Sequence, residues 1–208
     1  MILKIKSEED KFLEEVYEKA MKELDEFFEL NWKRNRPNIY LIRDRKTINT
    51  IRKEETADWN VGWIGGIDVY ILDKDNYEKE SCHKYSDEEY ANTIKHELAH
   101  SFTKVFSGVS GKPKWLWEGL AIYLSGQLKQ RKRLEKLTNF LYFYEARAVE
   151  GVYEESGFAV EFLVETHGKK KLLALLKILK EKDTNEEFAG KFKEIYGFDL
   201  TYENFRVL

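Results

Sequence analysis

The chain has 208 residues, which fits one domain or one domain with a helical subdomain. Its formal net charge is -3 and 35% of its residues are charged, with mixed sign, so the composition excludes the overall basic field of a nucleic-acid or anionic-membrane binder. The single cysteine, Cys82, excludes an internal disulfide framework. No stretch resembles a signal peptide or approaches the roughly 18 apolar residues of a membrane span. We therefore expect a soluble, cytoplasmic protein without nucleic-acid or membrane partners, and the composition leaves its oligomeric state open.

Helix and strand patterns alternate in the first 80 residues. Apolar residues at helical spacing predict a helix from Ser7 to about Leu30. Further elements follow, each bounded by turn signals. They are a strand at residues 38–43, a short helix from 44 to about 55 and, after a turn at Gly65-Gly66, a second strand at residues 67–72.

The patterns from residue 86 onward are helical. Ser86 and Glu89 have the spacing of a capping box and predict a long helix that reaches Phe106. A loop at residues 108–113 leads to a helix at 114–125, and the chain beyond Leu128 is typical of helix throughout. Breaks are expected near Gly151, Gly168, Asp183-Thr184 and Gly197, with a second capping box at Thr184 and Glu187. The order predicts an α+β fold, with an α/β subdomain at 1–126 and a mostly α-helical C-terminal subdomain at 127–208.

The sequence His96-Glu97-Leu98-Ala99-His100 is an H-E-x-x-H motif. Residues i and i+4 of a helix lie one turn apart on the same face, so the two imidazoles could bind one Zn²⁺ ion. Glu97 lies roughly 100° further around the helix axis, within reach of a water that zinc makes acidic. An apolar stripe on the other side of the helix is expected to face the core. Its members are Ala91, Ile94, Leu98, Phe102 and Val105. The alternative is that both histidines are ordinary surface or core-edge residues.

A zinc site needs a third protein ligand and an open fourth position, and Glu118 is the best candidate for that ligand. It lies near the start of the next helix, in the sequence Trp-Leu-Trp-Glu-Gly-Leu-Ala. Two helices joined by a short loop lie antiparallel, so Glu118 can face the histidines. The alternative is a surface glutamate on a Trp-rich packing helix.

The HELAH motif followed by WLWEGLAIYLSG resembles the gluzincin branch of the zincin metallopeptidases, and within it the small peptidase-MA-like proteins. The resemblance is specific over residues 86–126 and extends more loosely to 157–168. It implies a zincin-like fold, in which a small sheet packs on the long metal-binding helix, and one catalytic unit that hydrolyses peptide or protein substrates. It also implies one Zn²⁺ per chain, held by His96, His100 and Glu118, with Glu97 as general base.

Other features of the resemblance concern the surroundings of the metal. It implies that the strand at 67–72 is an exposed edge that pairs with an extended substrate, although an internal strand is as compatible with the sequence. Tyr153 stands where related proteins often carry a tyrosine that stabilises the oxyanion, and its alternative is a packing residue. The Glu-x-x-x-Asp pattern of the thermolysin type is absent, because Ile122 occupies the Asp position.

Other hypotheses stay open from the sequence. One is a non-catalytic zinc-binding module that serves partner recognition. Another is a different zinc hydrolase or a DNA-associated metalloprotease of the SprT type, which would need a histidine as third ligand. His167 is the only histidine after His100, and its place before Gly168 is typical of a helix C-terminus. A further hypothesis is that residues 197–208 shield the cleft.

Overall fold

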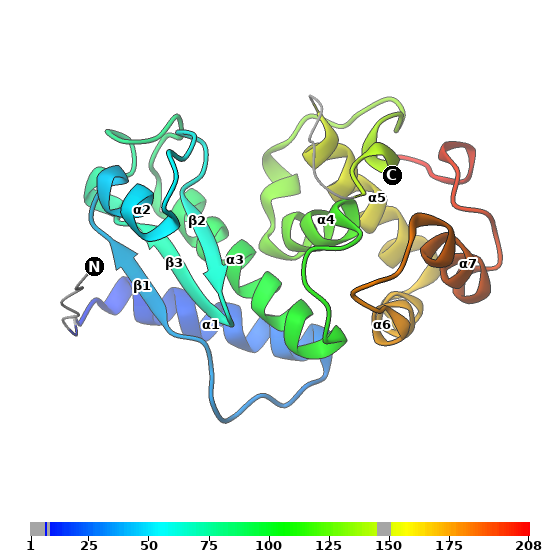
Figure 1. Cartoon of the computed structure of the whole chain (residues 1–208), viewed down its shortest axis with the longest axis horizontal. Helices are drawn as coiled ribbons and strands as arrows, with labels where there is room; N and C mark the ends of the chain where they lie inside the picture. Colours follow the sequence, from blue (N-terminus) through cyan, green and yellow to red (C-terminus); the bar gives the residue numbers. More distant parts are fainter. Residues whose placement is uncertain (1–6, 8, 145–150) are drawn as a thin grey trace.

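The computed structural model describes residue 7, residues 9–144 and residues 151–208. These residues form an α+β fold, with the strands and α1 toward one end and α5, α6 and α7 toward the other (Figure 1). The helices are α1 (Lys11–Phe28), α2 (Arg45–Arg52), α3 (Asp87–Ser107), α4 (Lys114–Ser125), α5 (Val152–His167), α6 (Lys169–Ile178) and α7 (Asn185–Tyr196). The strands are β1 (Ile39–Ile42), β2 (Gly62–Gly65) and β3 (Asp68–Leu72). Among the described residues, none of the helices combines the length and apolar composition needed to cross a membrane.

The sheet has the strand order β1-β3-β2, with β1 parallel and β2 antiparallel to β3. The central strand is therefore β3, and the prediction that residues 67–72 form an exposed edge is wrong. Its two neighbours, β1 and β2, are the edges of the sheet, and the sequence did not reveal β2 as a strand. It is four residues long and begins and ends with glycine, so it lacks the run of β-branched and alternating residues that signals a strand.

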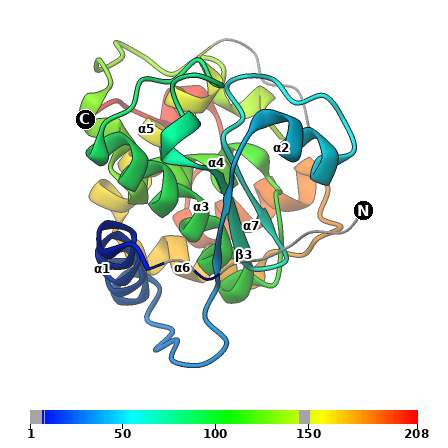
Figure 2. The ribbon, with the colours of Figure 1, turned by 90° about the vertical axis from the view of Figure 1, so that its left-hand side faces the viewer.

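Helix α3 is the element on which the sheet packs, and α1 lies along it (Figures 1 and 2). Ile94, Leu98 and Phe102 are fully buried, which confirms this part of the predicted apolar stripe. Val105, expected in the same stripe, is 42% exposed, because it lies in the last turn of α3, beside the loop that follows α1. The predicted start of α1 near Ser7 is also wrong. The N-cap is Asp10, whose side chain accepts a hydrogen bond from the Leu13 N–H at 3.2 Å.

The prediction of helix from Leu128 onward is wrong for the segment between α4 and the next described helix. Residues 127–144 contain only short 3₁₀ turns, at Gln127–Gln130 and Phe140–Tyr142. A buried glutamate on α5 explains part of this. The Glu155 carboxylate accepts hydrogen bonds from the backbone N–H groups of Thr138 (2.8 Å), Asn139 (2.5 Å) and Phe140 (3.0 Å). These donors are thus satisfied by a side chain from a distant helix rather than by a helical turn. The capping box at Thr184 and Glu187 is confirmed at the start of α7.

The C-terminal segment belongs to the core of the helical part. Phe205 is 6% exposed, and its ring lies 4.9 Å from the ring of Phe140 and 5.5 Å from that of Phe162. This packing does not support the hypothesis that residues 197–208 form a detachable shield over the cleft, because removing Phe205 would open the core.

Helices α4 and α5 cross with their backbones in close contact, and two glycines make this possible. A Cβ atom at Gly119 would lie 2.3 Å from the backbone oxygen of Ser156. A Cβ atom at Gly157 would lie 2.7 Å from Cγ2 of Ile122. Since real Cβ atoms do not approach backbone oxygen that closely, a side chain at residue 119 would push α4 away from α5.

We expect Gly119→Ala to lower the free energy of unfolding by about 1–3 kcal/mol or more, because overpacking a backbone contact forces the helices apart. Gly190→Ala is the matched control. Gly190 is also helical, in α7, and a Cβ there meets no atom within 4 Å. That change should raise the free energy of unfolding by about 0.5–1 kcal/mol. Urea denaturation of both variants measures the difference, and equal stabilities would contradict the close crossing.

Candidate metal centre

Helices α3 and α4 pack against each other and bring three ligand-type side chains together. His96 and His100 lie one turn apart on α3, and their Nε2 atoms are 3.1 Å apart. Oε2 of Glu118, on α4, lies 3.4 Å from Nε2 of His96 and 3.5 Å from Nε2 of His100. Across the described residues, this is the one group of three or more metal-ligand side chains whose ligand atoms lie within 4.8 Å of one another.

The geometry of this triangle fits a tetrahedral metal ion. Zinc with bonds of about 2.0–2.2 Å separates neighbouring ligand atoms by roughly 3.3–3.6 Å, close to the three distances here. Two imidazole nitrogens and one carboxylate oxygen are also a donor set that zinc accepts. Three protein atoms leave the fourth position open, as in sites where a metal acts on a substrate. The residues present could therefore hold one zinc ion.

The charge of Glu118 is stabilised by its surroundings. Burial alone would raise the pKa of its carboxyl, but the charge and hydrogen bonds of His100 and His96 hold this pKa well below its ordinary value. The other oxygen, Oε1, lies 3.3 Å from Nζ of Lys114. For His96, burial alone would lower the pKa of the ring. Its hydrogen bond to Glu118 and the charge of Glu97 outweigh burial, so this pKa is raised above its ordinary value. The carboxylate thus remains ionised in a site that is largely closed to water.

The two histidine rings are held in different ways. Nδ1 of His96 lies 3.0 Å from the side-chain oxygen of Gln127. The ring of His100 stacks on Trp117, with centroids 4.5 Å apart and planes at 5°. Nδ1 of His100 is buried and has no hydrogen-bond partner among the described residues. The sequence did not point to Gln127, because it lies beyond the end of α4 and outside any spacing rule for a partner of the ligands.

Glu97 lies directly beneath the edge strand. Its side chain is buried, and burial raises the pKa of the carboxyl above its ordinary value. A Cβ atom at Gly62 of β2 would lie 3.0 Å from both Cγ and Oε1 of Glu97. The sheet edge and the carboxylate are therefore in contact, and only a glycine fits between them without movement.

Tyr153 lies on α5, in the first turn of that helix. Its ring packs edge-on against Phe143, with centroids 5.0 Å apart. Burial, followed by the negative charge of Glu118, raises the pKa of its phenol to about 12. The phenol is therefore protonated at neutral pH and lies within the electric field of Glu118. The contact with Phe143 fits a packing residue, and the influence of the Glu118 charge fits a residue near the metal site. The role of Tyr153 in stabilising the oxyanion therefore stays a prediction.

The remaining titratable candidates lie elsewhere. The ring of His167 is surrounded by aromatic rings, at centroid distances of 5.4 Å from Phe162, 5.6 Å from Tyr196 and 5.2 Å from Phe198. A third histidine ligand of the SprT type is therefore not supplied by His167. Cys82 is exposed, and Nε2 of His83 lies 2.8 Å from the backbone oxygen of Trp59.

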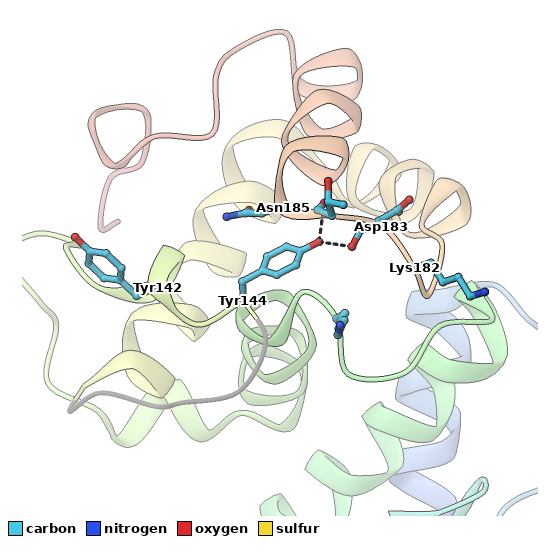
Figure 3. A pocket seen from close by; sticks show the side chains of 7 residues that line it. Tyr142, Tyr144, Lys182, Asp183 and Asn185 are labelled. Carbon is cyan, nitrogen blue, oxygen red and sulfur yellow. Dashed lines mark hydrogen bonds between the residues drawn. The ribbon is translucent and has the colours of Figure 1, made fainter.

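A separate hollow of about 500 Å³ lies in the helical part, beside the turn that joins α6 and α7 (Figure 3). The hydroxyl of Tyr144 donates there to the backbone oxygens of Asp183 (3.1 Å) and Thr184 (2.9 Å). Its lining includes none of the metal-ligand candidates and not Glu97. We assign no chemistry to this hollow.

The part of the chain that carries the histidines and the glutamate matches a known family. Residues 86–206 match the Peptidase MA superfamily. The match spans more than half of the chain, so the chain belongs to this superfamily. It begins at Ser86, the N-cap of α3, and leaves out the sheet. No curated protein and no solved structure gives a significant match.

We expect the full chain to bind about one zinc ion, and Glu118→Ala to weaken that binding by more than the roughly 10–100-fold that loss of an outer-shell partner costs. The reason is that the substitution removes one of three ligand atoms. Glu88→Ala is the control, since Glu88 is exposed at the start of α3. Elemental analysis after zinc loading and dialysis measures the stoichiometry. Undiminished zinc in Glu118→Ala would remove Glu118 from the ligand set.

Proposed function

We propose that this chain is a zinc-dependent metallopeptidase of the gluzincin type, with a zincin-like fold, that hydrolyses peptide bonds in peptide or protein substrates. The observation that carries the proposal is the triangle of His96, His100 and Glu118, with the carboxylate of Glu97 buried and in contact with the edge strand β2. Membership of the Peptidase MA superfamily supports the reaction class.

His96, His100 and Glu118 would hold the ion. When bound, zinc lowers the pKa of a water in its open position toward about 7 and polarises a carbonyl oxygen. Glu97 would take a proton, at a carboxylate oxygen, from the attacking water as the water oxygen bonds to the carbonyl carbon of the peptide. Its raised pKa makes it a better proton acceptor than an exposed glutamate. The same carboxyl group then delivers the proton to the nitrogen of the departing amine. One buried group thus serves as base and then as acid.

The substrate would pair with β2 rather than with β3. The N–H of Leu72 donates to the backbone oxygen of Val61 at 2.8 Å, so the ladder directs the peptide groups of Val61 and Trp63 toward β3. Alternation along the strand then turns the peptide groups of Gly62 and Ile64 to the free side. An extended peptide can add to such an edge by main-chain hydrogen bonds. Pairing beside Gly62 would bring its backbone next to Glu97.

Tyr153 would supply the hydrogen bond that stabilises the negative charge on the carbonyl oxygen, because a phenol that keeps its proton at neutral pH can donate. In this arrangement residues 1–126 supply the ligands, the base and the substrate strand. Residues 127–208 supply Tyr153 and the helices against which α4 packs. Both parts therefore form one catalytic unit.

We expect Glu97→Gln to keep zinc and to lose turnover by about 10²–10⁴-fold, because an amide has the same shape but cannot take a proton. Cleavage of a mixed peptide library, followed by mass spectrometry, compares it with the parent chain at equal zinc content. Equal cleavage by both would show that the mechanism is wrong. Zinc binding by the parent without cleavage of any peptide would favour a non-catalytic zinc-binding module.

We expect Gly62→Ala to lower kcat by roughly 10–100-fold, because a methyl group 3.0 Å from Cγ and Oε1 would displace the Glu97 carboxylate. Zinc content should not change, since the three atoms nearest to a Cβ at Gly62 all belong to Glu97, which is not one of the ligand candidates. Steady-state kinetics on a peptide cleaved by the parent chain measures the effect. Gly190→Ala serves as the control, and an unaltered kcat in Gly62→Ala would contradict the contact between β2 and Glu97.

A further inference from the structure

The turn that ends α4 returns the chain to the helix that carries the histidines. Gly126 ends α4 in the left-handed conformation, with φ 90°. A Cβ there would lie 3.8 Å from Oδ1 of Asn92, one turn before His96 on α3. Leu128, two residues later, is 7% exposed and fixes the turn in the core. The residues on both sides of Gln127 are thus held in place, Gly126 beside α3 and Leu128 in the core, and Gln127 lies next to α3.

The contact between Gln127 and His96 determines which nitrogen of the ring is available. A side-chain amide oxygen can only accept a hydrogen bond, so at 3.0 Å from Oε1 it is Nδ1 of His96 that carries the proton. In the neutral ring the other nitrogen, Nε2, then has the lone pair that a metal ligand needs. Nε2 faces the triangle, where it lies 3.4 Å from Oε2 of Glu118.

Within the described residues, the second histidine has no equivalent hydrogen bond. Nδ1 of His100 has no partner among the described residues, and its ring is fixed by stacking on Trp117. The Gln127 contact is therefore the one hydrogen bond, in the part of the chain that the structure describes, that reaches an outer ring nitrogen of either histidine.

The partner is neutral, where such an outer-shell acceptor is often a carboxylate. The site already contains two buried carboxyl groups, of Glu97 and Glu118. A carboxylate at residue 127, which is half-buried, would add a third negative charge beside them. The residue one helical turn after Glu118, which faces the same side of α4, is the apolar Ile122. An amide from beyond the helix end thus orients the ring without adding charge.

We propose that Gln127 is a positioning residue for His96, whose amide oxygen fixes the ring and its tautomer so that Nε2 faces the metal. The inference rests on the proposed zinc site. It predicts that the acceptor oxygen at residue 127 matters more than the size of the side chain.

The test compares Gln127→Met, which keeps the length and removes the acceptor, with Gln127→Glu, which keeps both. Gln130→Met is the control, because Gln130 lies in the same turn and is exposed. Metal-free full-length proteins are titrated with zinc against a chromophoric chelator. We expect Gln127→Met to weaken zinc binding about 10–100-fold, as loss of an outer-shell partner does. Gln127→Glu and the control should bind about as tightly as the parent chain.

The outcomes separate this inference from the proposed function. A parent chain that binds no zinc would overturn both. A parent that binds zinc, together with Gln127→Met of equal affinity, would overturn only the role of Gln127. A Gln127→Glu protein as weak as Gln127→Met would also overturn it, because the acceptor would then be irrelevant. Thermal unfolding of the metal-free proteins shows whether each variant is folded. The visible spectrum of the Co²⁺-loaded proteins adds a readout of ligand geometry that a general loss of packing would not mimic.

Discussion

The rest of the structure depends on the burial of one ionised carboxylate, that of Glu118. Moving a charge out of water is costly unless it is paired and hydrogen-bonded, and here the pairing comes from His96, His100 and Lys114. The histidines lie on α3 and the carboxylate lies on α4, so the two helices must keep a fixed relation. The two histidine nitrogens that pair with this charge form, together with Oε2 of Glu118 itself, the triangle in which a metal could be held. Stabilising the buried charge of Glu118 and holding a metal ion therefore require the same placement of His96, His100 and Glu118.

Packing on the far side of α4 maintains that geometry. Gly119 follows Glu118 directly and lies against the backbone of Ser156 on α5, so the helix cannot move in that direction. Gly157 of α5 likewise lies against the side chain of Ile122 on α4, where a Cβ atom would not fit. The sequence Glu-Gly in α4 thus combines a residue that faces the histidines with a residue that allows close packing of the helices behind it. Apart from the proposed roles of Gln127 and Tyr153, the helical part of the chain contributes to the site as a support.

The sheet serves the site through one edge. The outer side of β2 has no neighbouring strand among the described residues, and its Gly62 lies on the carboxylate of Glu97. The arrangement places this main-chain edge next to the buried carboxyl group of Glu97, the proposed general base. An enzyme that acts on extended peptides needs this combination, because a sheet edge can bind the peptide backbone and a neighbouring carboxyl group can act on the bound peptide bond. The family match begins after the sheet, so the position of β2 was visible only in three dimensions.

The sequence by itself determined the elements with strong periodicity and the residues with fixed helical spacing. The pair His96 and His100 needs only the helical turn to meet, and the helix was clear from its cap at Ser86 and its stripe of buried residues. Glu118 needed the further assumption that a short loop joins antiparallel helices. Tertiary structure alone decided the strand order, because pairing between short strands depends on distant contacts and not on local pattern. It also decided the irregular path of residues 131–139, where Glu155 satisfies the backbone, and the contact of Gln127 with His96. These features arise where a side chain from one element meets the backbone or ring of another, and no local propensity encodes such a meeting.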